Sequence, residues 1–225
     1  MVRCSVCDIE IERNYCPQCG QYHTGRRITN KSLLLDLVNG LYSLDKSFYE
    51  NMKLGLFRPA KLVRNYWEGY RRYYFSPGKF LTIASLFLVL NFLIQDDFFS
   101  ITVVSDGIGP HFVFLFILLS LYSLSSWGVY YLYGKNFNEH FVLNIYSISI
   151  WIICITPFSI LWGYLNVEGV EELWTAFLLL VIGVWNNRVF KMVWWKRILY
   201  IAANYTVLTL LFYVLLHASN FNGDF

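Results

Sequence analysis

The chain has 225 residues, of which 56% are hydrophobic and only 15% are charged. A soluble domain is typically about 45–50% apolar and about 25% charged, so this composition excludes an ordinary soluble domain and favours a chain surrounded largely by lipid. The net charge of +3 is small and indicates no particular partner, but the distribution of the charges along the chain is informative.

The first 22 residues carry four of the five cysteines, in two close pairs. The spacing is Cys4-x2-Cys7-x8-Cys16-x2-Cys19, and Gly20 follows. Two such pairs are the typical ligands of a tetrahedral zinc ion, and the glycine permits a tight turn after the second pair. About 20 residues cannot bury enough apolar surface to fold alone, so metal binding would supply the folding free energy. We therefore predict a structural zinc ribbon over residues 1–22.

Other interpretations of the cysteines are weaker. Disulfides are disfavoured because the charge distribution described below places these thiols in a reducing compartment. Rubredoxin-like iron normally needs a longer chain, and a redox dithiol would explain one pair only. Four protein ligands leave no open position on the metal for catalysis. We interpret the nearby His23 as a surface residue and Cys154, in the hydrophobic region, as a small packing residue.

Residues 23–79 are predicted to connect the ribbon to the membrane. A basic linker over residues 23–31 leads into an amphipathic helix, which we expect either in the inner membrane interface or packed against the cytoplasmic ends of the spans. Apolar residues recur there at helical spacing, at Leu33, Leu34, Leu37, Leu41, Leu44, Phe48, Met52 and Leu56.

Basic and aromatic residues then alternate over residues 58–77, which we call the collar. Lys and Arg bind anionic headgroups and Tyr and Trp favour the interface, so we interpret the collar as a membrane-surface anchor. A lipid-headgroup or nucleic-acid site is the alternative interpretation, although we do not expect a nucleic acid as partner.

The sequence then predicts a membrane domain over residues 80–217, with five transmembrane helices; a bilayer core needs about 17–25 helical residues. Ser76 and Pro77 form a helix-start signal for the first span. Pro157 should kink the third, and Asn186 begins a polar run that shortens the fourth. The predicted spans are 77–95, 111–133, 140–164, 173–190 and 198–217, followed by a tail at 218–225.

All 18 Lys and Arg residues fall on one side of this five-span arrangement. Thirteen lie at or before Lys79, one is Lys135 between the second and third spans, and four lie between the fourth and fifth. The positive-inside rule places that side in the cytoplasm, and the start of the sequence shows no secretory signal. We therefore expect an inner-membrane protein with a cytoplasmic N-terminus and an extracytoplasmic C-terminus. We also expect most of five Trp residues to anchor the interfaces, Trp162 and Trp174 outside and Trp185, Trp194 and Trp195 inside.

Several short motifs resemble one family. They are Cys16-Pro17-Gln18-Cys19-Gly20-Gln21, Leu44-Asp45-Lys46-Ser47-Phe48, Arg58-Pro59, Tyr66-Trp67-Glu68-Gly69-Tyr70-Arg71-Arg72-Tyr73 and Pro77. Over roughly the first 95 residues the chain resembles an uncharacterised bacterial family, domain of unknown function 3667. The resemblance implies a four-cysteine ribbon followed by a multi-pass membrane domain, and it implies no activity.

The sequence contains no recognisable catalytic motif. Its spans hold no Asp or Glu away from their ends, which lowers the expectation of a coupled transporter. Asn91, Asn144 and Asn204 are polar residues within spans, and such residues more often hydrogen-bond between helices than bind substrate. We therefore expect a non-enzymatic scaffold or adaptor, whose ribbon binds a protein partner. One alternative is a transporter of small solutes or lipids, although the odd number of spans and the lack of an internal repeat count against it. A less favoured alternative is a lipid-modifying enzyme.

Overall fold

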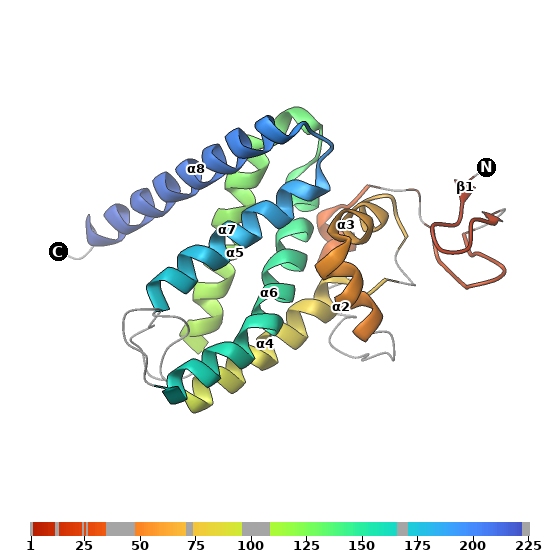
Figure 1. Cartoon of the computed structure of the whole chain (residues 1–225). Coiled ribbons are helices and arrows are strands. Elements are labelled where there is room, and N and C mark those ends of the chain that lie inside the picture. The colour runs from red at the N-terminus through yellow and green to blue at the C-terminus, as the bar shows by residue number, and fades with distance from the viewer. Residues whose placement is uncertain are drawn as a thin grey trace.

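The computed structural model describes residues 2–11, 14–23, 25, 27–34, 48–70, 74–95, 109–165 and 171–221. It shows a small N-terminal ribbon beside a body of long helices (Figure 1). The elements are β1 (Val2–Arg3), β2 (Glu10–Ile11), α2 (Phe48–Phe57), α3 (Pro59–Trp67), α4 (Pro77–Ile94), α5 (Gly109–Val129), η1 (Tyr131–Tyr133), α6 (Phe137–Leu165), α7 (Glu171–Val189) and α8 (Trp194–Phe221).

Helices α4 to α8 lie where the sequence predicts the five spans, within four residues at each end. Three of them, α4, α6 and α8, are long and apolar enough to cross a membrane. The apolar runs that the described residues of α5 and α7 provide are shorter, Leu115–Val129 and Phe177–Val189. The structure therefore has the helical body of a membrane protein, while the crossing of all five helices stays a prediction.

The predicted start of the first span is confirmed in atomic detail. The Ser76 hydroxyl accepts a hydrogen bond from the backbone N–H of Lys79, and Pro77 occupies the first helical position. This side chain satisfies one of the N–H groups that a helix start leaves unpaired. Helix α6 contains Pro157 within a single helix, and the kink predicted there stays a prediction.

Helix α6 is the centre of the body. It packs against α4, α5 and α7, and 67% of its most apolar 18-residue stretch is buried inside the protein. Helix α8 packs against α5 and α7, and only 11% of its stretch is buried. Because α8 exposes many large apolar side chains, apolar surroundings such as a bilayer suit it.

Successive helices of the body run in opposite directions. Arg64 of α3 donates hydrogen bonds to the carbonyl of Val189 at the end of α7, and Trp67 of α3 donates to the carbonyl of Glu139 near the start of α6. Tyr130, just after α5, stacks on Phe190, just after α7, with ring centroids 4.5 Å apart. These chain ends therefore meet at the end of the body that carries α3 and the ribbon, which we call the ribbon end (Figure 1).

The amphipathic helix predicted from Leu33 onward is described only at its two ends. Residues 30–34 form a helical turn, α2 begins at Phe48, and residues 35–47 lie outside the described part of the chain. Of the two placements predicted for this helix, α2 shows packing on the body, because it contacts α6 and α3.

Gly55 allows α2 to approach the body closely. A Cβ atom at this position would collide with Cδ1 of Ile150 on α6. The Gly55 carbonyl also accepts a hydrogen bond of 2.8 Å from Nε1 of Trp185 on α7. A glycine that weakens helix propensity is thus explained by tertiary packing.

Trp185 is buried, so its predicted role as an interfacial anchor is wrong, whereas Trp194 and Trp195 are exposed.

The collar aromatics correct a second prediction. Tyr66, Trp67, Tyr70 and Tyr74 are all buried, with at most 6% of their surface exposed. They pack inside the protein and do not lie on a membrane surface. On α3, Lys61 is exposed and Arg64 is half-buried, whereas Tyr66 and Trp67 lie on the buried face with Leu62 and Val63. The alternation of basic and aromatic residues in the sequence concealed this division.

Candidate metal centre

The two cysteine pairs lie in two turns of the same construction. The N–H of Cys4 donates to the carbonyl of Ile9 at 2.8 Å, and the N–H of Cys16 donates to the carbonyl of Gln21 at 2.9 Å. The residue after each second cysteine has a positive φ, 59° at Asp8 and 69° at Gly20. Aspartate and glycine are among the residues that tolerate this conformation best. The repeated geometry explains why both pairs present their thiols in the same way.

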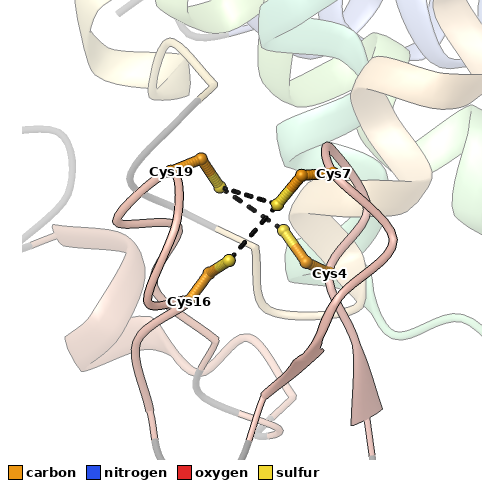
Figure 2. Close-up of side chains that lie close together, drawn as sticks. All are labelled: Cys4, Cys7, Cys16 and Cys19. Carbon is orange, nitrogen blue, oxygen red and sulfur yellow. Dashed lines mark hydrogen bonds between the residues drawn. The ribbon is translucent and has the colours of Figure 1, made fainter.

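The four thiols converge on one point (Figure 2). The Sγ atoms of Cys7 and Cys16 are 3.3 Å apart, those of Cys4 and Cys19 are 3.5 Å apart, and those of Cys7 and Cys19 are 3.6 Å apart. All four Sγ atoms lie within 4.8 Å of one another, and none is in a disulfide. Four thiolates at about 2.3 Å from one tetrahedral metal would be about 3.8 Å apart. The donor set therefore fits a metal ion.

The electrostatics of the turns favour a thiolate at Cys16. The backbone N–H groups of Cys19 and Gln18 point at its sulfur and lower the pKa of Cys16 to about 6. Hydrogen bonding to the neighbouring Cys16 instead raises the pKa of Cys7 to about 12, because a single negative charge among close thiols disfavours a second. A bound cation would remove this conflict, because it favours deprotonation of every thiol that it binds.

The ribbon has little else to hold it together. The strands β1 and β2 pair over two residues each, with Val2 opposite Ile11. The buried residues of the described ribbon are Cys4, Ile11, Cys16 and Gln21, so Ile11 is the only aliphatic side chain among them. A core of this size cannot offset the conformational entropy of some 20 residues, which is why the donor set matters for folding.

The collar holds the ribbon against the body. The Tyr70 hydroxyl donates a hydrogen bond of 2.7 Å to the carbonyl of Arg3, and the hydroxyls of Tyr74 and Ser5 are 3.3 Å apart. The His23 ring packs on that of Tyr70, with centroids 4.8 Å apart, and the two residues form a β-bridge. His23 was predicted to be a surface residue and is instead half-buried in this contact.

A buried carboxylate holds the linker that follows the ribbon. Glu139 is 1% exposed, and its Oε2 lies 3.1 Å from the Arg27 guanidinium, while Lys135 Nζ lies 3.7 Å from Oε1. Nearby, the Asn136 amide donates to the carbonyl of Ile28 at 3.2 Å. The ribbon is thus attached to the ribbon end of the body on both sides, through the collar and through the linker.

Sequence reasoning missed Glu139, although the sequence holds a signal for it. Glu139 and Asn136 exchange two hydrogen bonds of 2.8 Å, each side chain accepting from the other's backbone N–H. This is the reciprocal pattern of a capping box, with a polar residue three positions before an acidic one, in front of an apolar run. The motif predicts the helix start at residue 137, and only the fold shows that the carboxylate is buried.

The polar residues within the spans connect helices, as predicted. The Asn144 side chain donates to the Ser123 hydroxyl at 3.2 Å and accepts from the Asn186 amide at 2.8 Å. The Ser125 hydroxyl donates to Asn204 Oδ1 at 2.6 Å. These bonds join α5, α6, α7 and α8, so they contribute to helix packing. Asn91 is also fully buried.

One Ser–His contact could suggest nucleophilic chemistry. The Ser126 hydroxyl and His140 Nδ1 are 2.9 Å apart, but both side chains are fully buried between helices. A nucleophile needs access to its substrate, so this pair is better explained as helix packing. Cys154 is partly buried against the core, which agrees with the packing role predicted for it.

Comparison with known proteins adds no relative. No family model matches the chain, and neither a curated protein nor a solved structure is similar to it. The resemblance to domain of unknown function 3667 therefore stays a prediction, and the function must be argued from the residues themselves.

Proposed function

We propose that this protein is a membrane scaffold, in which five transmembrane helices hold a cytoplasmic zinc ribbon that binds a protein partner. The observation that carries the proposal is the closed four-cysteine donor set on a ribbon attached to the helical body at two places. A metal with four protein ligands has no position left for substrate, so a structural role is favoured over catalysis.

Zinc is the metal that this donor set favours. Two C-x2-C pairs that supply four thiolates in a tetrahedral arrangement are the usual structural zinc site, and zinc imposes no redox chemistry on it. Purified protein should contain about one zinc ion per chain. Metal analysis that finds iron, or folded ribbon without metal, would contradict this assignment.

The proposed orientation follows from the charges and the directions of the helices. Lys79, Lys135, Arg188 and Arg197 are described residues at helix starts or ends, and all lie at the ribbon end of the body. The positive-inside rule places that end in the cytoplasm, at the inner membrane of a bacterial cell. A reporter fused after Phe225 should then be active only outside the cytoplasm, and a cytoplasmic readout would change the number of spans by one.

Exposed apolar side chains on the ribbon support a protein partner. Val2, Ile9 and Tyr15 are large apolar residues that are 39%, 40% and 52% exposed. Partner-binding surfaces are enriched in such residues, above all in tyrosine. The collar contacts the ribbon through Tyr70 and Tyr74, so these exposed apolar side chains would meet a partner at a fixed orientation.

The test is capture of partners by the full-length protein in detergent after cross-linking in cells. We expect the double variant Ile9→Ser, Tyr15→Ser to keep its metal and to lose the captured partner. A matched control, Tyr49→Ser, changes a tyrosine on α2 that is 72% exposed. Identical captured proteins for the wild type, the ribbon variant and the double variant Cys16→Ser, Cys19→Ser would refute the scaffold.

A further inference from the structure

A pocket of about 480 Å³ lies where three elements of the ribbon end meet. The end of α2 contributes Phe57, the length of α3 and its flanking residues contribute most of the wall, and Arg188 near the end of α7 completes the lining. The pocket is separate from the metal centre, and the residues that line it are Phe57, Arg58, Pro59, Ala60, Lys61, Arg64, Asn65, Glu68 and Arg188.

The wall of the pocket is strongly basic. Arg58, Lys61, Arg64 and Arg188 carry four positive charges, and Glu68 carries the one negative charge. Within the described part of the chain, none of these four cations forms an ion pair with a carboxylate. Four like charges around one cavity repel one another, and a bound anion would relieve that repulsion.

The start of α3 adds to the positive potential. Helix starts favour Ser, Thr, Asp or Asn as the cap and acidic residues in the first turn. Here Arg58 occupies the cap position without a capping hydrogen bond, the first turn contains no acidic residue, and Lys61 lies within it. Local rules of helix stability are thus broken at the same place where the cations gather, and such conflicts are expected at functional sites.

The pocket has a fixed frame. The guanidinium of Arg64 donates to the carbonyl of Val189, with its Nε 2.7 Å away, and this contact joins α3 to α7. Asn65 is buried, and its amide donates to the Tyr74 hydroxyl at 2.7 Å. Arg58, Lys61 and Arg188 are exposed, so their charged ends can turn toward a ligand without disturbing this frame.

Apolar groups at the edge of the pocket indicate which anion it takes. Phe57 lines the pocket and is 73% exposed. The same end of the body carries Trp194 and Trp195, which are 72% and 52% exposed at the start of α8. Exposed aromatic rings beside Lys and Arg are typical of the headgroup region of a membrane, where both acyl chain and phosphate are within reach.

We propose that this pocket binds the phosphate of an anionic phospholipid headgroup at the inner surface of the membrane. Arg58, Lys61 and Arg188 contact the phosphate, Arg64 supports it from behind, and Phe57 contacts the acyl chain. This proposal rests on the proposed placement of the ribbon end at the membrane, but it requires neither the metal nor a protein partner.

The experiment is native mass spectrometry of the full-length protein in detergent, titrated with phosphatidylglycerol or with phosphatidylcholine. Wild-type protein should bind phosphatidylglycerol more tightly than the zwitterionic lipid. The triple variant Arg58→Gln, Lys61→Gln, Arg188→Gln should bind phosphatidylglycerol at least tenfold more weakly, since each basic group near an anionic surface contributes about 1 kcal/mol.

The matched control is the triple variant Lys31→Gln, Lys53→Gln, Lys196→Gln. It removes the same charge from exposed residues that do not line the pocket, and it should keep wild-type affinity. Equal losses in both triple variants, or no preference for phosphatidylglycerol in the wild type, would overturn the proposal. Displacement of the lipid by inorganic phosphate at an equal concentration would identify a soluble phosphate as the ligand and would also overturn it.

The pocket variant should retain its metal, its helical content and its captured partner. Loss of lipid binding with these properties intact would support the pocket independently of the scaffold. Conversely, a protein that captures no partner but still selects phosphatidylglycerol would refute the scaffold and leave the lipid site standing.

Discussion

The ribbon and the helical body are stabilised by different means. In the ribbon, two of the four buried described residues are cysteines, and their sulfurs face one another across a space suited to a metal. In the body, α6 alone buries Val142, Leu143, Ile145 and Ile150 completely. Between helices in a membrane such side chains gain mainly van der Waals contacts, each of them small, because lipid tails are equally apolar, whereas a zinc ion bound as proposed contributes about 10–16 kcal/mol at once.

Because of this difference, we expect the ribbon and the helical body to lose their structure separately. A body with many small contributions loses stability gradually, while a ribbon with one large contribution loses its structure when that contribution is removed. The collar and Glu139 connect the two regions, so changes there should affect both to a smaller degree. Three predictions test this division, from the largest expected effect to the smallest.

The change Cys16→Ser should abolish metal binding and the structure of the ribbon, because three thiolates and a hydroxyl no longer form the site. Metal analysis should show a fall from about one ion per chain to nearly none. Trypsin should then cleave the N-terminal segment rapidly, while the helical signal in far-ultraviolet circular dichroism stays unchanged.

The control for this variant is Cys154→Ser, which changes the cysteine on α6 and should leave the metal content unaltered. If Cys16→Ser also lowered the unfolding temperature of the helices, the ribbon and the body would form one cooperative unit.

The change Glu139→Gln should destabilise the body by about 1–3 kcal/mol, because a buried charged hydrogen-bond acceptor is lost. Arg27 and Lys135 would lose their common partner, although their partial exposure limits the cost. Thermal unfolding in detergent measures this effect. Glu50→Gln, a change to an exposed carboxylate on α2, serves as the control and should shift the unfolding temperature little. A Glu139→Gln protein as stable as the wild type would mean that Arg27 and Lys135 are satisfied by water.

The change Tyr70→Phe should have the smallest effect. It removes the hydrogen bond from the Tyr70 hydroxyl to the Arg3 carbonyl and keeps the ring against His23. A loss of about 1 kcal/mol would raise the amide exchange rates of the ribbon about fivefold without loss of metal. Hydrogen exchange followed by mass spectrometry measures this, with Tyr49→Phe as the control. Unchanged exchange in Tyr70→Phe would show that this hydrogen bond does not stabilise the ribbon.

Features that are local in sequence could be predicted. The spacing of four cysteines predicts the donor set, because two C-x2-C turns place thiols the same way wherever they occur. Ser76 and Pro77 predict the start of α4, because a cap needs only its own turn. Long apolar runs predict α5 to α8 within a few residues, since burial and helical hydrogen bonding both favour them.

Features that depend on distant pairs could not be predicted. The collar tyrosines and Trp67 seemed suited to a membrane surface because nothing near them in sequence shows the acceptors at Arg3 and Glu139. Arg188 looked like an interruption of an apolar run, and only the fold places it beside α3. Composition and hydrophobic periodicity can be read from the sequence, but they do not show which helix ends come together in the fold.

The linker contact has a consequence for the order of events during synthesis. Arg27 and Glu139 are 112 residues apart in the chain. At about 5–20 residues per second, the ribosome adds Glu139 roughly 6–22 seconds after Arg27. The four cysteines are complete throughout that interval, whereas the contact of Arg27 with Glu139 cannot yet form. A metal ion that binds early, as proposed, would therefore meet a ribbon whose linker is not yet held by Glu139, and the linker contact forms only after the start of α6 has been made.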